Sequence, residues 1–370
     1  MNQSRIVEEF LRLIAIPSPS RNERLMADAL KETLTALGCQ VREDDAGTQI
    51  GGTAGNVIAL LPGTVGTPVM FAAHMDRVPN GDNIHPVIAD GKITTDGTSI
   101  LAADDVSGIA SILEGIRLLQ ESGRPHCDVE IAFTVSEEKL LAGSRHLDFG
   151  SFRARNAYCM DSPGPTGRII NGAPGKAMLH VDVYGKPAHA GNSPEKGVNA
   201  LTAAAKILAE IRDGRLDPET TVNWAIISAG NVTNVVCDHV RFTGEARSRD
   251  PEKLRAYVEY AKRHCEEVIS RTAATHDFTA EFCYDGFSVA PEEEILTTLC
   301  GVLKASGMEP LIEAGGGGMD ANRFNANGIR SVGVATGYSK NHSTAEELSI
   351  ADLEKAGQLV CDLILAWSEK

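Results

Sequence analysis

The chain of 370 residues is longer than one hydrophobic core usually supports, so we expect two domains with well-buried interiors. Hydrophobic residues make up 42% and charged residues 23%, which is typical of globular proteins and excludes a disordered or collagen-like chain. The formal net charge of -15 would repel phosphate backbones and anionic lipids, so we expect neither nucleic acid nor a membrane as a partner.

Two further features predict a cytoplasmic protein. Charged residues interrupt the apolar ones at the start of the chain, and no later stretch approaches the roughly eighteen apolar residues of a membrane-spanning helix. The eight cysteines form no CxxC pattern, and reduced thiols are their ordinary state in the cytosol.

The first part of the chain alternates helical patterns with short apolar runs. Apolar residues at helical spacing predict a helix that ends before Pro17, a second helix over about residues 22–37, and a long one over about residues 107–120. Four apolar runs predict buried strands: NVIALL, VMFAAH, VEIAFTV and NAYCM. Buried strands that alternate with helices predict an α/β fold with a mostly parallel mixed sheet.

The pattern changes after the glycine- and proline-rich stretch GRIINGAPGKA. The following segment reads as strand, helix, strand, strand, helix, strand, which predicts a ferredoxin-like α+β domain. Alternating strands and helices then resume towards the C-terminus. We therefore predict a discontinuous α/β domain over residues 1–173 and 288–370, with an inserted domain over residues 174–287.

Five acidic or histidine clusters lie at the ends of predicted buried strands or in the loops beyond them. In an open α/β sheet, ligands bind at this edge. The clusters are HMD at 74–76, ADD at 103–105, EE at 137–138, MD at 160–161 and NHST at 341–344. Each cluster alone has an ordinary explanation, because histidines at strand ends often form structural hydrogen bonds and adjacent glutamates usually form a solvated edge.

The first two clusters suggest how a metal could be held. Asp76 lies two residues after His74, near enough to accept a hydrogen bond from its imidazole, as carboxylates near metal-binding histidines commonly do. Asp104 and Asp105 precede a predicted helix, so one of them can cap the helix while the other coordinates a metal.

The third cluster, Glu137 and Glu138, follows a predicted strand. On an extended segment these side chains would point in opposite directions, so one can bind a metal while the other takes a proton. Two histidines and three carboxylates form a nitrogen and oxygen set suited to zinc, with manganese or cobalt as substitutes. Because gathered negative charges repel unless a cation neutralises them, the sequence predicts a dinuclear site, the known arrangement for metal-aided hydrolysis.

The sequence resembles the M20 metallopeptidases, and within them the tripeptidase group called peptidase T. The matching segments cover almost the whole chain in the family's order. They are FAAHMDRVP, DGTSILAADDVSGIA, FTVSEEKLLAGS, CMDSPGP, GKPAHAGNSPEKGVNA, GGGGMDANRFNANGI and NHSTAEELSI. The resemblance implies a zinc-binding catalytic domain and an inserted lid domain that often dimerises, so a homodimer through the lid is expected.

The resemblance also implies five ligands for two zinc ions. His74 and Asp161 would bind one ion, and Glu138 and His342 would bind the other. Asp104 would bridge the two ions.

Further roles come from the same resemblance. Asp76 would orient His74, and Glu137 would be the general base. The peptide bond between Asp104 and Asp105 would be cis.

Three residues of the predicted lid also match the family. His189 matches a histidine that, in dimeric relatives, reaches the active site of the other subunit and stabilises the oxyanion. Taken alone, a histidine in such a glycine- and proline-rich loop would be read as solvent-exposed. Asn234 and Arg247 fall where lid residues of relatives contact substrate carbonyl or carboxylate groups, and Arg249 is a close alternative to Arg247.

The resemblance implies a metallo-exopeptidase that hydrolyses short peptides, with Glu137 activating a zinc-bridging water. One alternative is an amidohydrolase that acts on N-acyl or N-carbamoyl amino acids, because the same metal centre and fold serve both reactions. A second alternative is a catalytically silent metal-binding protein.

Overall fold

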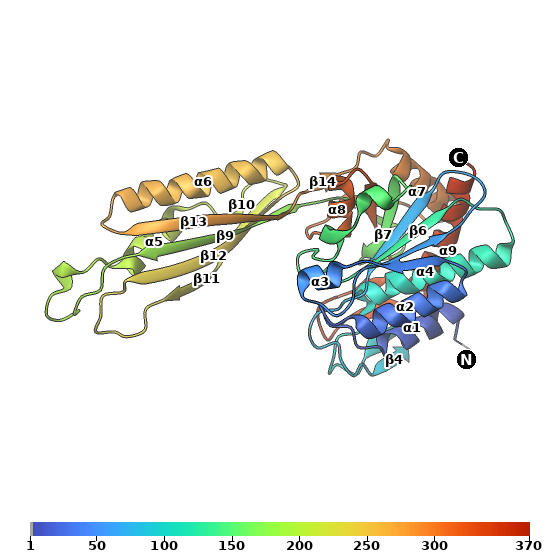
Figure 1. Ribbon diagram of the computed structural model, residues 1–370, viewed down its shortest axis with the longest axis horizontal. Coiled ribbons are helices and arrows are strands. Elements are labelled where there is room, and N and C mark those ends of the chain that lie inside the picture. The colour runs from blue at the N-terminus through green and yellow to red at the C-terminus, as the bar shows by residue number, and fades with distance from the viewer. Residues whose placement is uncertain (1–2) are drawn as a thin grey trace. The chain divides into compact units, whose positions relative to one another are not determined.

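The computed structural model describes residues 3–370, which fold as two compact units (Figure 1). The first unit comprises Met1–Ala173 and Ser288–Lys370, of which residues 1 and 2 lie outside the described range. The second unit is Pro174–Phe287, inserted into the sequence of the first. Within residues 3–370, no helix is both long and apolar enough to cross a membrane.

A mixed sheet forms the centre of the first unit. Its strands are Gln40–Glu43 (β1), Val57–Leu61 (β2), Val69–His74 (β3), Val129–Thr134 (β6), Asn156–Ser162 (β7), Arg168–Ala173 (β8), Phe287–Ser288 (β14), Leu311–Ala314 (β15) and Arg330–Ala335 (β16). Their order over the described residues is β1-β2-β6-β3-β7-β16-β8-β14, with β15 paired to β8. The central strands β6, β3, β7 and β16 are parallel, whereas β1, β2 and β8 run antiparallel to neighbours.

The parallel register brings the predicted clusters to one edge of this sheet. Every residue of β3 and of β6 is buried, as their continuous apolar runs predict. His74, the last residue of β3, lies opposite Thr134, the last residue of β6. The loops that follow β3 and β6 therefore leave the sheet side by side.

Helices pack against the sheet and one another in the first unit. They are Arg5–Ile14 (α1), Arg24–Ala36 (α2), Ala46–Ile50 (α3), Ala103–Ser122 (α4), Glu294–Ala305 (α7), Asp320–Ala326 (α8) and Ile350–Ser368 (α9). The buried helix α4 contacts β3 and β7 as well as α1 and α9. Gly115 permits the close approach of α4 and α9, because a Cβ atom there would lie 2.5 Å from the Cβ of Val360.

A small antiparallel sheet in the first unit was not predicted from the sequence. Its strands are Pro86–Ala89 (β4), Lys92–Thr95 (β5), Tyr338–Ser339 (β17) and Glu347–Ser349 (β18). They pair in the order β17-β18-β5-β4. The loop that carries His342 lies between β17 and β18, so this sheet fixes both ends of the loop.

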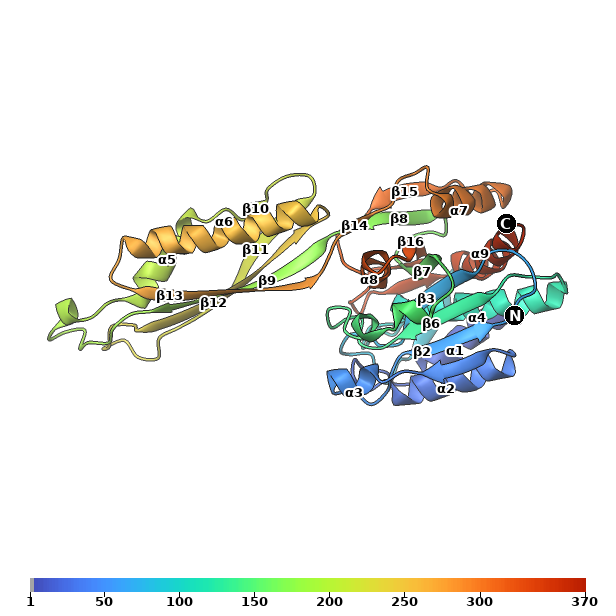
Figure 2. The same ribbon diagram turned by 45° about the horizontal axis from the view of Figure 1, so that its top comes forward.

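The second unit is an antiparallel sheet with two helices, of which the later one in the chain is the longer (Figure 2). Its elements are Gly175–Tyr184 (β9), Ala200–Glu210 (α5), Gly214–Arg215 (β10), Thr220–Ala229 (β11), His239–Ser248 (β12), Pro251–Ser270 (α6) and Thr275–Tyr284 (β13). The strand order is β10-β11-β12-β9-β13, and both helices pack against β9 and β12. The predicted fold class, an α/β domain with a ferredoxin-like insertion, is confirmed.

Candidate metal centre

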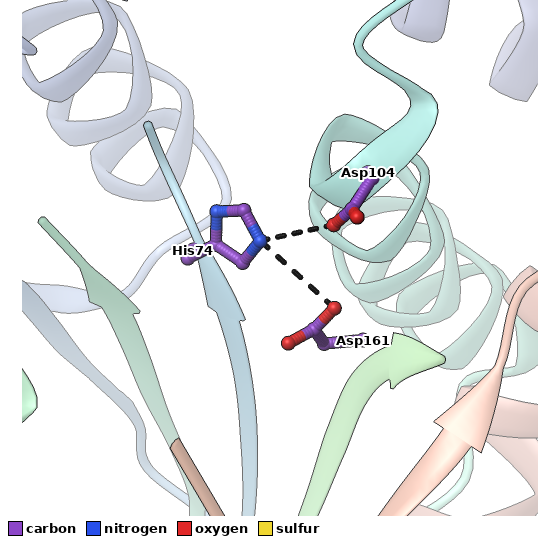
Figure 3. Close-up of side chains that lie close together, drawn as sticks. All are labelled: His74, Asp104 and Asp161. Atoms are coloured by element: carbon purple, nitrogen blue, oxygen red, sulfur yellow. Dashed lines mark hydrogen bonds and ion pairs between the residues drawn. The ribbon is translucent and has the colours of Figure 1, made fainter. Parts of the chain in front are cut away.

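His74 is the central residue of the site. Its buried ring places Nδ1 at 2.9 Å from the carbonyl oxygen of Asp76. Its Nε2 lies 3.1 Å from Oδ1 of Asp104 and 3.9 Å from Oδ1 of Asp161 (Figure 3). Because a carbonyl oxygen can only accept, Nδ1 carries the proton in the neutral ring, and the lone pair of Nε2 points at the two carboxylates.

Asp104 lies between two histidines. Its Oδ1 faces His74, while its Oδ2 lies 3.2 Å from Nε2 of His342 and accepts a hydrogen bond from Nδ2 of Asn341 at 2.7 Å. The peptide bond between Asp104 and Asp105 is cis, as the resemblance implies. A carboxylate with each oxygen towards a different histidine has the arrangement that a bridging ligand requires.

The second histidine has a carboxylate partner of its own. Nε2 of His342 lies 2.8 Å from Oε1 of Glu138. In three groups of residues, the candidate ligand atoms lie within 4.8 Å of one another. These groups are His74, Asp104 and Asp161; His74, Glu137 and Glu138; and Asp104, Glu138 and His342. The structure thus brings all five predicted ligands, and Glu137, into one cluster.

The conformation of Glu137 and Glu138 differs from the expectation. Strand β6 ends at Thr134, and the two glutamates lie in a turn rather than on an extended segment. Ser136 enters this turn with a φ of 51°, and the N–H of Leu141 donates to the carbonyl oxygen of Glu137 at 2.8 Å. The turn brings both side chains to the cluster, so Glu137 and Glu138 do not point in opposite directions as residues of a strand would.

Asp76 connects His74 to this turn. Its carboxylate lies 3.4 Å from Nδ1 of His74, farther than its own carbonyl oxygen. The same carboxylate accepts hydrogen bonds from the N–H of Glu137 at 2.8 Å and of Glu138 at 3.3 Å, and from the hydroxyl of Ser20 at 2.6 Å. Asp76 therefore positions the two glutamates as well as the histidine.

Comparison with known proteins identifies the family. Residues 171–273 match the M20 peptidase dimerisation domain, and residues 56–167 match peptidase family M28. An aminopeptidase PepT from Bacillus cereus is 39% identical, with a TM-score of 0.94 and full coverage of both chains. A tripeptidase from Staphylococcus aureus is 32% identical, with a TM-score of 0.95 and full coverage of both chains. The chain belongs to the M20 metallopeptidase family.

Within this family the metallopeptidase is peptidase T-like. A peptidase T from Exiguobacterium is 29% identical over 290 residues, which cover 75% of this chain and 68% of the relative. Neither the amidohydrolase alternative nor the catalytically silent one is favoured by these similarities.

The electrostatics of this M20 site fit a bound cation. Burial, together with nearby carboxylates, raises the pKa of Glu137 and of Asp161 well above the usual values. Hydrogen bonds that the His342 ring donates to the carboxylates of Asp104 and Glu138 raise its pKa to about 10. Burial opposes a charged ring at His74, but its contacts with Asp104 and Asp76 prevail and raise its pKa. A divalent cation would relieve the repulsion between the clustered carboxylates. The nitrogen and oxygen donors of the cluster are ligands that such metals accept.

Sequence reasoning missed Glu346, which holds the loop before α4. The Oε2 of this buried carboxylate accepts hydrogen bonds from the N–H of Leu101 at 2.8 Å and of Ala102 at 2.9 Å. Its Oε1 accepts one from the N–H of Asp104 at 3.1 Å. Burial raises the pKa of Glu346 to about 7, and the charge of Asp104 adds to the shift. Its place four residues after His342 was the only sequence signal.

Sequence reasoning also missed Asp320, at the start of α8. Its carboxylate accepts hydrogen bonds from the hydroxyls of Thr134 and Ser144, both at 2.5 Å. These contacts connect the end of β6 with the segment that follows the glutamate turn.

The predicted lid residues all belong to the second unit of the metallopeptidase. His189 lies in an exposed loop, where its Nδ1 accepts hydrogen bonds from the N–H of Gly191 and of Asn192, each at 3.2 Å. The carbonyl oxygen of Asn234 accepts a hydrogen bond from Ala190 at 2.9 Å, so the loops of His189 and Asn234 are adjacent. Arg247 lies near the end of β12 and pairs with Glu245 at 2.8 Å.

Proposed function

We propose that the chain is a metallo-exopeptidase that hydrolyses short peptides with the help of two metal ions. Peptide substrates are supported by its similarity to an aminopeptidase PepT and to a tripeptidase, each aligned over the whole chain. The observation that carries the proposal is the position of Asp104, whose two carboxylate oxygens face the imidazoles of His74 and His342.

Five residues of the cluster would hold the ions. We assign His74 and Asp161 to one ion, Glu138 and His342 to the other, and Asp104 to both. The nitrogen and oxygen donors favour zinc, and cobalt or manganese would fit the same set. When bound, the ions would polarise the scissile carbonyl group and lower the pKa of the attacking water.

Glu137 would move the proton during catalysis. This residue is 8% exposed and lines the cleft that contains the metal ligands, and the carboxylate of Asp76 accepts a hydrogen bond from its backbone N–H. A carboxylate oxygen of Glu137 would take a proton from the attacking water and then deliver it to the leaving amine. Asp76 would keep both Glu137 and His74 in position for this transfer.

The second unit would contribute substrate binding and dimerisation. Its match to the peptidase dimerisation domain supports a homodimer formed through this unit. By family resemblance, we assign His189 to stabilisation of the oxyanion, and Asn234 and Arg247 to substrate contacts. Sedimentation analysis of the full chain should show a dimer at micromolar concentration, and a monomer there would contradict the assignment.

We propose the cytoplasm as the site of action. The basis is that cysteines such as Cys39, Cys127 and Cys361 are buried thiols rather than disulfides. Cell fractionation with an antibody against the chain would test this, and recovery from the extracellular medium would contradict it.

A substrate panel tests the proposed activity. The zinc-reconstituted chain would be assayed against dipeptides, tripeptides, longer peptides, N-acetyl amino acids and N-carbamoyl amino acids. The proposal predicts turnover of short peptides, a preference for a free α-amino group, and two metal ions per chain. Preferred hydrolysis of acylated amino acids would support the amidohydrolase alternative instead, and two bound metals without any turnover would support the silent one.

A further inference from the structure

The cleft that contains the metal ligands also contains a cation that the proposed mechanism does not use. This cleft, of about 260 Å³, is lined by residues of the first unit alone. Among the described residues that line it, Arg168 is the only arginine or lysine. It is the first residue of β8 and lies outside the five acidic and histidine clusters. The proposed mechanism gives roles to the metal ligands and to Glu137 but none to Arg168.

The guanidinium of Arg168 is only partly occupied by contacts within the chain. Its Nε pairs with Glu313, and its Nη1 donates to the carbonyl oxygen of Pro163 at 2.5 Å. An arginine side chain has five N–H donors, so these contacts leave three, including both on Nη2, with no acceptor in the described chain. The Arg168 side chain is 24% exposed and lines the cleft.

The contact with Glu313 does not prevent a second anion from binding. Glu313 lies on β15 with a side chain that is 42% exposed, and exposed ion pairs of this kind contribute little. It approaches the Nε side of the guanidinium, whereas the remaining donors are mainly on Nη2. An arginine can hold two oxygen acceptors at once, because its donors form a planar fork.

Four consecutive glycines, residues 315–318, line part of the cleft and add no side chains to it. At Gly316 and Gly317 an added Cβ atom would meet nothing within 4 Å, and neither residue has a positive φ. Crowding and backbone conformation therefore do not require glycine at these two positions. They leave open space in the cleft that Arg168 also lines.

A peptide that enters this cleft brings a negative charge into an acidic site. Three carboxylates line the cleft around His74 and His342, and Glu137 adds a fourth. To bind there, a carboxylate of the substrate needs a positively charged partner that is not already paired with the metal-binding carboxylates. We propose that Arg168 binds a carboxylate of the substrate and so selects short peptides that carry one. The inference takes from the proposed function only that the ligand is a peptide.

Binding measurements on an inactive protein test this without turnover. Calorimetry would use the zinc-loaded Glu137→Gln protein, with and without Arg168→Gln. Three peptides would be titrated: trialanine, its C-terminal amide, and an amide that carries a glutamate side chain. Loss of Arg168 should lower the affinity for a carboxylate-bearing peptide at least about tenfold and change the affinity for the plain amide by no more than about threefold. Weaker binding of trialanine would identify the C-terminal carboxylate as the group that Arg168 binds. Weaker binding of the glutamate peptide would identify the side-chain carboxylate instead.

Two further variants separate recognition from a structural role. Glu313→Gln removes the carboxylate partner but keeps the charge of Arg168, so binding of the carboxylate-bearing peptide should be unchanged or tighter. Arg168→Lys should retain part of the preference. Arg153→Gln is the matched control, because Arg153 also pairs with a carboxylate, that of Asp128, but does not line this cleft. It should leave the affinity for all three peptides unchanged.

The inference is overturned if Arg168→Gln weakens all three peptides equally or weakens none. It is also overturned if Glu313→Gln has the same effect as Arg168→Gln, or if the Glu137→Gln protein binds neither trialanine nor the amide that carries a glutamate side chain. Failure of the proposed function would look different. In that case the wild-type chain would hydrolyse none of the peptides, while a preference for carboxylates that depends on Arg168 would still be measured.

Discussion

The carboxylate of Asp76 accepts a hydrogen bond from the backbone N–H of Glu137 at 2.8 Å. Through this contact the loop after β3, which follows His74, fixes the turn after β6, which carries the proposed general base. The two loops leave neighbouring parallel strands, so one buried carboxylate controls the geometry of both halves of the site.

Replacing Asp76 by alanine should therefore impair both metal binding and catalysis. Loss of a carboxylate that orients a metal-binding histidine typically costs about 10- to 100-fold in metal affinity or activity. We expect kcat/KM to fall by at least that factor, together with a weaker metal affinity in a chelator competition. Ser20→Ala is the matched control, because it removes only the hydroxyl that donates to Asp76 and should change kcat/KM little. Unchanged metal affinity in the Asp76→Ala protein would contradict the role.

Glu346 should matter for stability and for the position of Asp104. Glu346→Ala would leave three buried N–H groups without their acceptor, each costing about 1–3 kcal/mol. We expect a large fall in the free energy of unfolding and a loss of activity, whereas Glu346→Gln should do less harm because it keeps one oxygen acceptor. Denaturant unfolding measures the difference. Glu347→Gln, which affects ion pairs with the exposed Lys92 and Lys340 and a 3.3 Å hydrogen bond from the hydroxyl of Ser339, should cost no more than about 1 kcal/mol.

The network around Glu43 should make stability depend on acidic pH. Hydrogen bonds from Arg24 outweigh burial and, with Lys31, lower the pKa of Glu43 from 4.5 to about 2. Because the folded-state pKa is depressed, this contribution is fully present above pH 4.5 and is lost as the pH falls towards 2. The Tm difference between wild type and Glu43→Gln should thus be largest near neutral pH and shrink in acid. A difference that stays constant down to the acid limit would argue against the network.

Packing between α4 and α9 gives a prediction that is independent of the site. Gly115→Val would place its Cβ atom 2.5 Å from the side chain of Val360, which requires the helices to separate. Overpacking of this kind costs about 1–3 kcal/mol or more, measured as a fall in the free energy of unfolding. Gly301→Ala in α7 is the control: its Cβ would meet nothing within 4 Å, so this change should be neutral or stabilise by up to about 1 kcal/mol. Equal effects of the two substitutions would contradict this packing.

The strands and the proposed metal ligands could be located from the sequence because both signals are local. Apolar runs such as VMFAAH mark buried strands, and a parallel sheet brings the residues at their carboxyl ends to one edge. The conformation of Glu137 and Glu138 could not be predicted, because it depends on the φ of Ser136 and on a hydrogen bond from the N–H of Leu141 to the carbonyl oxygen of Glu137.

Long-range contacts explain the other omissions. Glu346 accepts from residues more than 240 positions earlier, and no periodic pattern signals such a contact. Arg168 lies at the start of a strand like many surface arginines, and only the folded chain places it in the cleft with the metal ligands.

The most direct test of the proposed mechanism is turnover of a short peptide by the Glu137→Gln protein, with its metal content measured on the same sample. Glu137 is proposed to move the proton and not to bind either ion. The account therefore predicts two metal ions per chain, as in the wild type, and a fall in kcat of about 10²- to 10⁴-fold, the usual contribution of general acid–base catalysis. Near-normal kcat with both metals bound would contradict the account.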